Sequence, residues 1–133
     1  VGDDTLDTIF SCEYTKDSDV GTYVITPTDC TFTSGVKNNY NIEYVNGTLS
    51  VYGSSYNKTS KTVKIYSKYD TDIDCYIVSY AENGTLDGIK KEHCSLKADE
   101  ISTIDISSLN ITENDSIKIF LWDNNLTPVE ITN

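Results

Sequence analysis

Residues 40–53 read YNIEYVNGTLSVYG, and this stretch carries the strongest fold signal in the chain. Apolar and polar residues alternate on both sides of Asn46-Gly47. An Asn-Gly pair between two alternating runs is typical of a two-residue β-hairpin turn. With the turn at this place, Tyr44 would face Leu49 across the hairpin. The stretch therefore predicts β structure, with Asn46 and Gly47 in structural positions.

The rest of the chain shows the same pattern, in short alternating runs separated by turn residues about every ten positions. This pattern is typical of all-β proteins. A polar break at residues 53–55 divides the chain, so we expect two small β modules, over residues 1–53 and 57–133. Strands of the second module are expected at 62–67, 73–80, 89–96, 101–106, 116–122 and 129–132, which fits an antiparallel sandwich of the immunoglobulin or fibronectin-III type.

A second local signal lies in DVGTYVI, where Asp19, Gly21 and Tyr23 form a D-x-G-x-Y array. This spacing is typical of the tyrosine corner of immunoglobulin-like sandwiches, in which the phenol bonds back to the backbone at the start of a strand. A tyrosine that simply begins a strand would give the same letters. Both interpretations assign these three residues a structural role.

The composition argues against several classes of function. The chain has 133 residues and a net charge of −11, and all ten of its basic residues are lysines. Nucleic-acid binding depends on clustered cations, usually with arginine, so no nucleic-acid partner is expected. There is also no apolar stretch of about 20 residues, so no membrane insertion is expected. Methionine is absent, and we interpret the chain as a piece of a longer protein.

The sequence offers little for catalysis or metal binding. The single histidine, His93, lies inside an expected strand with no nucleophile motif beside it. The spacing of Asp70, Asp72 and Asp74 imitates the start of an EF-hand loop, but the required glycine and glutamate do not follow. A looser calcium site in a sandwich loop is left open. We therefore expect no enzyme, no metal site and no cofactor.

The four cysteines show no C-x-x-C spacing, which argues against structural zinc and favours disulfides in an oxidising compartment. Cys12 and Cys30 share the first segment and are expected to pair across neighbouring strands. Cys75 and Cys94 would face opposite sides of the sheet if the turn between them has three residues, and would lie opposite each other if it has four. A Cys75–Cys94 disulfide is the second expectation.

One residue stands out for recognition, the single tryptophan in IKIFLWD. Alternation along this strand places Ile117, Ile119 and Leu121 on one face and leaves Phe120 and Trp122 on the other. If the aliphatic residues fill the core, the two aromatic rings form an outward platform on which a sugar could stack. The alternative is that a neighbouring module or a chain terminus covers the platform.

The first segment contains the three stretches GDDTLDTIFS, DVGTYVITPTDCTF and YNIEYVNGTLSV. With them, residues 1–53 resemble the C-terminal part of an MBG-type repeat, a β-rich module of bacterial surface proteins. The resemblance implies a module that is incomplete at its N-terminus. Another segment of the parent protein, or a partner chain, would then complete the sheet.

The second segment contains CYIVSYAENGTLDGIKKEHCSLKADE and IKIFLWDNNLTPV. Residues 57–133 are similar to an immunoglobulin- or fibronectin-III-like module at the C-terminal ends of secreted Gram-positive glycosidases and surface proteins. Such modules are non-catalytic attachments. The two resemblances imply an extracellular accessory role, as spacer, anchor or interaction module, with other domains of the parent protein as partners.

Two alternatives remain open at this point. The chain could bind a polysaccharide or host glycan through Phe120, Trp122 and nearby tyrosines. It could also be an adhesin domain that binds a host protein, which would require a larger exposed apolar patch or an open sheet edge.

Overall fold

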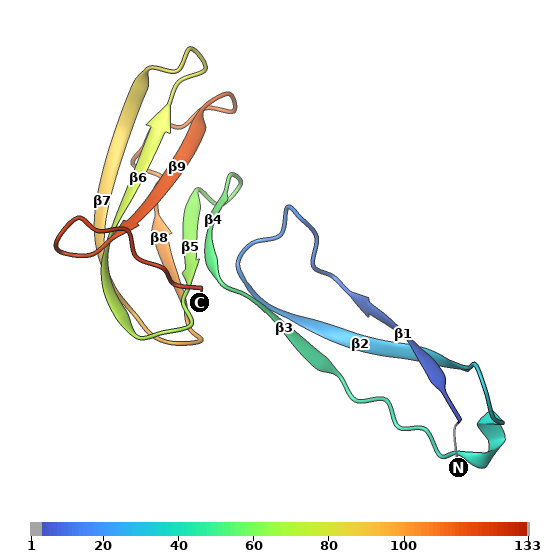
Figure 1. Cartoon of the computed structure of the whole chain (residues 1–133). Coiled ribbons are helices and arrows are strands. Elements are labelled where there is room, and N and C mark those ends of the chain that lie inside the picture. The colour runs from blue at the N-terminus through green and yellow to red at the C-terminus, as the bar shows by residue number, and fades with distance from the viewer. Residues whose placement is uncertain (1–3, 133) are drawn as a thin grey trace. The chain divides into compact units, whose positions relative to one another are not determined.

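The computed structural model describes residues 4–132, and these residues form strands, turns and one short 3-10 helix. The prediction of an all-β fold is confirmed. Contacts within the chain divide it into two compact units (Figure 1). Unit 1 comprises Val1–Ser18 and Thr22–Ser50, and unit 2 comprises Asp19–Gly21 and Val51–Asn133. Within residues 4–132 there is no helix with the length and apolar character that a membrane span requires.

Unit 1 is built on a single three-stranded sheet in the order β1-β2-β3. The strands are β1 (Leu6–Cys12), β2 (Gly21–Phe32) and β3 (Gly47–Val51). β1 runs antiparallel to β2, with a bulge at Thr28 of β2, opposite the step from Ile9 to Phe10. The 3-10 helix η1 (Lys37–Asn39) lies in the connection between β2 and β3.

The hairpin predicted at Asn46-Gly47 does not form. Gly47 is the first residue of β3 and lies beside Ile25 of β2, and its φ angle is not in the positive range that the predicted turn demands. The reversal occurs earlier, around Gly35 (φ +91°) and η1. Tyr44 consequently has no cross-strand partner in Leu49, and residues 41–46 run as irregular chain.

Unit 2 is a sandwich of two three-stranded sheets, in the orders β4-β5-β8 and β7-β6-β9. Every pairing in these two sheets is antiparallel. In chain order this is the A-B-E and C′-C-F arrangement of an immunoglobulin-type sandwich. The strands are β4 (Gly53–Asn57), β5 (Thr62–Tyr66), β6 (Thr71–Tyr80), β7 (Leu86–Leu96), β8 (Ile101–Asp105) and β9 (Ser116–Trp122).

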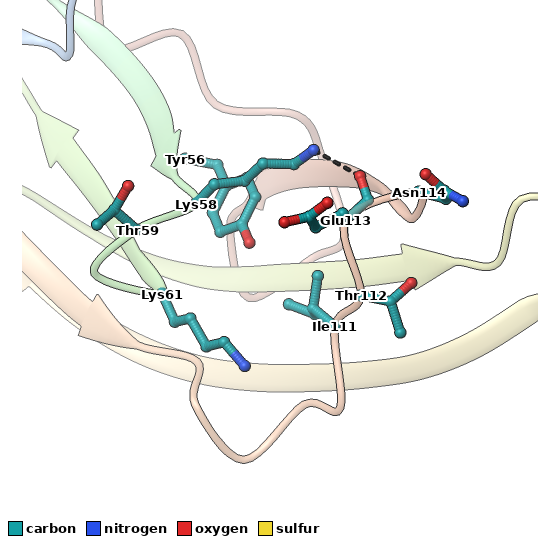
Figure 2. A pocket seen from close by; sticks show the side chains of 8 residues that line it. All are labelled: Tyr56, Lys58, Thr59, Lys61, Ile111, Thr112, Glu113 and Asn114. Carbon is teal, nitrogen blue, oxygen red and sulfur yellow. Dashed lines mark hydrogen bonds between the residues drawn. The ribbon is translucent and has the colours of Figure 1, made fainter.

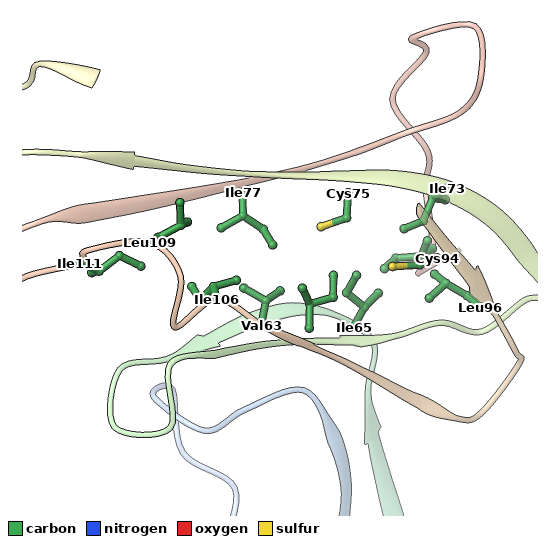
Figure 3. Close-up of a cluster of buried hydrophobic side chains, with 12 residues drawn as sticks. Val63, Ile65, Ile73, Cys75, Ile77, Cys94, Leu96, Ile106, Leu109 and Ile111 are labelled. Atoms are coloured by element: carbon green, nitrogen blue, oxygen red, sulfur yellow. The ribbon is translucent and has the colours of Figure 1, made fainter. Parts of the chain in front are cut away.

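Aliphatic side chains from both sheets of unit 2 meet in a closed core (Figure 3). Val63 and Ile65 of β5 point toward Ile73, Cys75 and Ile77 of β6, and all five are fully buried. Ile117, Ile119 and Leu121 pack against this cluster, as the alternation in β9 predicted. At about 25 cal/mol per Å² of apolar surface, such burial is the main stabilising term of the unit.

Five of the six strands expected in the second segment are present, with small shifts at their ends. The sixth, at 129–132, does not form as a strand. Pro128 has no N–H for a ladder, so the segment is fixed by single bonds, from Val129 N to Leu121 O and from Lys68 N to Ile131 O. The polar break at 53–55 is part of β4, which pairs with β5 over five residue pairs.

Candidate interaction surfaces

The outward face of the β7-β6-β9 sheet carries the aromatic residues singled out in the sequence. The register aligns three strands in rows, so each outward residue of β6 from Asp74 to Tyr80 has one neighbour on β7 and one on β9. Along β6 these rows read His93–Asp74–Trp122, Lys91–Tyr76–Phe120 and Ile89–Val78–Lys118.

The rings of Tyr76, Phe120 and Trp122 form one cluster on this face. Trp122 has its centroid 5.2 Å from that of Tyr76 and 5.8 Å from that of Phe120, with interplanar angles of 50° and 49°. Phe120 and Trp122 are half-buried rather than fully exposed. The tilted rings pack against one another, so they present a ridge and not a flat row of coplanar rings.

Charged groups surround this aromatic cluster. Asp74 accepts from Lys91 Nζ at 2.7 Å and lies 3.1 Å from His93 Nδ1. Lys91 first, and then His93, hold the pKa of the Asp74 carboxyl below its usual range. Lys91 Nζ also lies 5.3 Å from the Tyr76 ring centroid. The single histidine thus shares a hydrogen bond with Asp74 on the outward face of the sheet.

A cavity of about 590 Å³ lies at one end of unit 2, between the β4-β5 turn and the loop before β9. Lys58 and Lys61 come from the turn, and Tyr56 from β4 forms part of the wall (Figure 2). Lys58 Nζ donates to the carbonyl oxygen of Glu113 at 2.7 Å, so one of the two ammonium groups is already used by the fold. These residues carry no recognisable sequence signal, because a lysine-rich turn has no distinctive motif.

Asp19, Gly21 and Tyr23, the residues of the proposed tyrosine corner, lie in two different units. Asp19 accepts from Lys64 Nζ at 2.8 Å, and also from Ser55 and Asn57. These bonds fix the short segment Asp19–Gly21 against β4 and β5. Lys64 is the largest cause of the lowered pKa of the Asp19 carboxyl.

Tyr23 belongs to unit 1, where its ring packs edge-on against Tyr14 with centroids 5.2 Å apart. Gly21 adopts a φ of +145°, which side chains rarely tolerate, at the junction between the Asp19 segment and the rest of β2. Asp19 thus holds its segment through side-chain bonds within unit 2, whereas the ring of Tyr23 packs within unit 1. The role of the array as a tyrosine corner stays a prediction.

The structure does not bring Cys12 and Cys30 together. Cys12 lies opposite Ile25, whereas Cys30 lies opposite Thr8. The two positions are four residues apart along β1. This is about 13 Å at the usual rise per residue, which exceeds the reach of a disulfide. Cys30 is buried and its sulfur accepts from the Tyr44 hydroxyl at 3.6 Å.

Cys75 and Cys94 lie on the same face of the β6-β7 pair, as diagonal neighbours in the core. The loop between the two strands and a bulge at Ser79/Tyr80 set the register of this pair. This register differs from the one expected for a three-residue turn and from the one expected for a four-residue turn. Both thiols are free, as are those of Cys12 and Cys30. Burial, with a smaller contribution from Cys94, raises the pKa of the Cys75 thiol to about 12.

The aspartates that imitate a calcium loop point to different partners. Asp70 accepts from Ala98 N and from Lys97 Nζ, and Asp74 belongs to the network described above. No group of three or more histidine, cysteine or carboxylate side chains suited to a metal ion occurs among residues 4–132.

The comparisons with known proteins concern the first segment. Residues 1–50 match the family model of the MBG domain (YGX type). The predicted resemblance of this segment to an MBG-type repeat is thereby confirmed, and the MBG match suggests a non-catalytic repeat module of bacterial surface proteins. The match ends at the residue where unit 1 ends. Neither a curated protein nor a solved structure matches the chain.

Proposed function

We propose that the chain is a pair of non-catalytic accessory modules of a larger extracellular bacterial protein, either a cell-surface protein or a secreted glycoside hydrolase. Its role is to space and anchor the other domains of that protein. The MBG match of residues 1–50 is the observation that carries this proposal. The sandwich of unit 2 adds a physical reason, because its core and ladders suit a module that must keep its shape.

The arrangement of strands in unit 2 favours resistance to extension. The first strand, β4, pairs with the central strand β5 over five residue pairs. The last strand, β9, pairs with the central strand β6 over seven residue pairs. A force applied through the chain at both ends of the unit must break one of these ladders before the core opens.

Single-molecule extension in optical tweezers tests the spacer role. The full chain is held by handles at both termini and pulled. We expect a discrete unfolding step for unit 2 that releases roughly 300 Å of chain, less the folded length, at about 3.6 Å per residue. Ile77→Ala should lower the force of that step, whereas Ile9→Ala should not change it. Extension of unit 2 without a resolvable step would contradict the spacer role.

A second candidate function, carbohydrate binding, is favoured by the half-buried cluster of Tyr76, Phe120 and Trp122 beside Lys91. A pyranose ring can stack on a half-exposed indole while its hydroxyls bond to a neighbouring ammonium or carboxylate. The tilt between the rings suits one sugar unit rather than a long flat chain.

Tryptophan fluorescence tests this second candidate, because Trp122 is the only tryptophan. The full chain is titrated with soluble plant and host polysaccharides, and iodide quenching is followed in parallel. Binding predicts a spectral shift and protection from iodide with one polysaccharide, which Lys91→Met should weaken. A signal that no polysaccharide changes would remove the platform as a site and leave the spacer role.

A further inference from the structure

The β1 edge of the sheet in unit 1 is the surface that the described chain leaves unexplained. In the sheet order β1-β2-β3, β1 is paired with β2 on one side, and no strand among residues 4–132 pairs with its other side. Leu6, Ile9 and Phe10 of β1 are 48%, 53% and 66% exposed. An unpaired strand with exposed apolar side chains is a template for adding another strand.

The hydrogen bonds of β1 show which of its peptide groups face this free edge. The carbonyl oxygens of Thr5 and Ile9 point toward β2, where they accept from Thr33 N and from the Thr28 hydroxyl. Peptide groups alternate in direction along an antiparallel strand, so those of the even-numbered residues point away from β2. Leu6, Thr8, Phe10 and Cys12 therefore present their N–H and C=O groups at the edge.

This edge also lacks several of the features by which proteins prevent unwanted pairing. Edge strands are commonly protected by lysine, proline or inward-pointing charges. The seven residues of β1, LDTIFSC, contain none of lysine, proline or glycine and a single charge, Asp7. The edge strand β7 of unit 2 differs, since it carries Lys90 and Lys91. β1 is therefore open to pairing both chemically and geometrically.

The pattern of outward groups restricts how a second β1 could pair with the first. In an antiparallel ladder outward residues must lie opposite outward residues, so even-numbered residues pair with even-numbered residues. A ladder centred on Ile9 uses the whole strand and satisfies this condition. It places Leu6 opposite Cys12 and Thr8 opposite Phe10 of the other copy.

The same register is compatible with the side chains. Asp7 lies opposite Ser11, so no carboxylate within β1 faces another carboxylate. Ile9 lies opposite its own copy, and Leu6, Phe10 and Cys12 share one face. We propose that β1 pairs antiparallel with β1 of a second copy of the chain, in the register centred on Ile9, joining two three-stranded sheets into one.

The interface of this dimer is small. A seven-residue edge buries less area than the ~1,600 Å² of a standard protein–protein interface. Each chain also carries a net charge of −11, which opposes association at low ionic strength. The dimer therefore forms with increasing protein concentration and is strengthened by salt.

Sedimentation velocity of the full chain, over a range of concentrations at low and high salt, tests the association. Thr8→Pro removes an outward N–H without affecting the bonds from β1 to β2, and Thr8→Val retains that N–H. We expect the wild type and Thr8→Val to dimerise with increasing concentration and Thr8→Pro to remain monomeric, all with the same circular dichroism spectrum. A wild type that stays monomeric, or a dimer that persists in Thr8→Pro, would overturn the proposal.

Cross-linking tests the register itself. At the centre of the proposed ladder the two copies of residue 9 form a non-hydrogen-bonded pair with Cα atoms about 4.5 Å apart, within disulfide range. Under mild oxidation Ile9→Cys should yield a covalent dimer linked through position 9, identified by peptide mass spectrometry. Asp7→Cys is the matched control and should not link to its own copy. Equal linkage in both variants would overturn the register.

Discussion

The two units are built from the same kind of alternating sequence, yet they bury very different amounts of it. Unit 2 places twelve residues in one buried cluster. Cys30 is the one buried residue among the described residues of unit 1. The difference comes from layering, because two facing sheets enclose the apolar side of every strand whereas a single sheet encloses little.

Hydrogen-bonded ladders alone do not stabilise unit 1 to the extent that the buried core stabilises unit 2. The net contribution of one intramolecular hydrogen bond is about 1 kcal/mol, and ordering one residue costs a similar amount. Unit 2 offsets this cost by apolar burial, and unit 1 has little burial to do so. We therefore expect unit 1 to open at a lower free energy than unit 2.

Thiol labelling of the native chain gives the largest expected contrast between the units. Cys30 in unit 1 and Cys75 in unit 2 are both buried, so exposure alone does not distinguish them. If labelling follows opening of each unit, Cys30 should react with iodoacetamide faster than Cys75 by roughly 10³-fold, corresponding to about 4 kcal/mol. Mass spectrometry of labelled peptides over time gives both rates.

The unfolded chain serves as the control for this labelling, since all four thiols should then react at similar rates. In the native chain at pH 8 the Cys75 thiol is also protected by its pKa, which burial raises to about 12. Equal native rates for Cys30 and Cys75 would show that the two units open together, and the contrast drawn from their cores would be wrong.

Truncation of matched isoleucines sharpens the comparison. Ile77 is fully buried in unit 2, and Ile9 is 53% exposed in unit 1. Ile77→Ala should lower the free energy of unfolding of unit 2 by about 2–5 kcal/mol, because the removed atoms leave a cavity in the core. Ile9→Ala in the monomer should change the free energy of unfolding of unit 2 by less than about 0.5 kcal/mol. Urea unfolding monitored by Trp122 fluorescence measures both values.

The sequence predicted those elements of unit 2 in which local alternation and final packing agree. In β9 the alternation identifies the core face and the aromatic face, and the bounds of the strand match the structure. The strand β4 was missed because Gly53, Ser54 and Ser55 have low β propensity. Its pairing with β5 is a tertiary effect that the local sequence does not reveal.

The failure of the hairpin prediction at Asn46-Gly47 has a related cause. Asn46-Gly47 is a strong turn signal when it competes only with nearby residues, but here Gly47 pairs as part of β3 beside the long strand β2. The cysteines illustrate the same limit. Their relative positions depend on bulges in the β1-β2 and β6-β7 pairs, and each bulge shifts the register by one residue without a sequence signal.

Two aspartate–lysine pairs allow a partly buried ion pair to be compared with an exposed one. Asp19 is the partly buried case, with 22% of its side chain exposed and Lys64 at 2.8 Å. Asp19→Asn should lower the free energy of unfolding of unit 2 by about 1 kcal/mol at neutral pH, because the charge-assisted bond to Lys64 is lost. Urea unfolding at pH 7 measures the change.

The pH dependence of the same variant checks the cause. The pKa of the Asp19 carboxyl is lower in the folded chain than its unfolded value near 4. The stabilisation that the ionised Asp19 carboxyl contributes to the fold is therefore fully present above about pH 4 and is lost as the pH falls through the folded pKa. The difference between wild type and Asp19→Asn should shrink below pH 4. A difference that stays constant down to pH 2 would mean that Asp19→Asn destabilises unit 2 by changing the packing and not by removing the charge.

Asp70 is the exposed case and should give the smallest effect. Its side chain is 63% exposed and that of its partner Lys97 is 62% exposed, at a distance of 2.9 Å that is almost the same as in the Asp19 pair. Water and salt screen this pair, and an asparagine could still accept from Ala98 N. We therefore expect Asp70→Asn to leave the urea midpoint of unit 2 unchanged within error. A shift as large as that of Asp19→Asn would show that distance, rather than burial, decides the strength of these pairs.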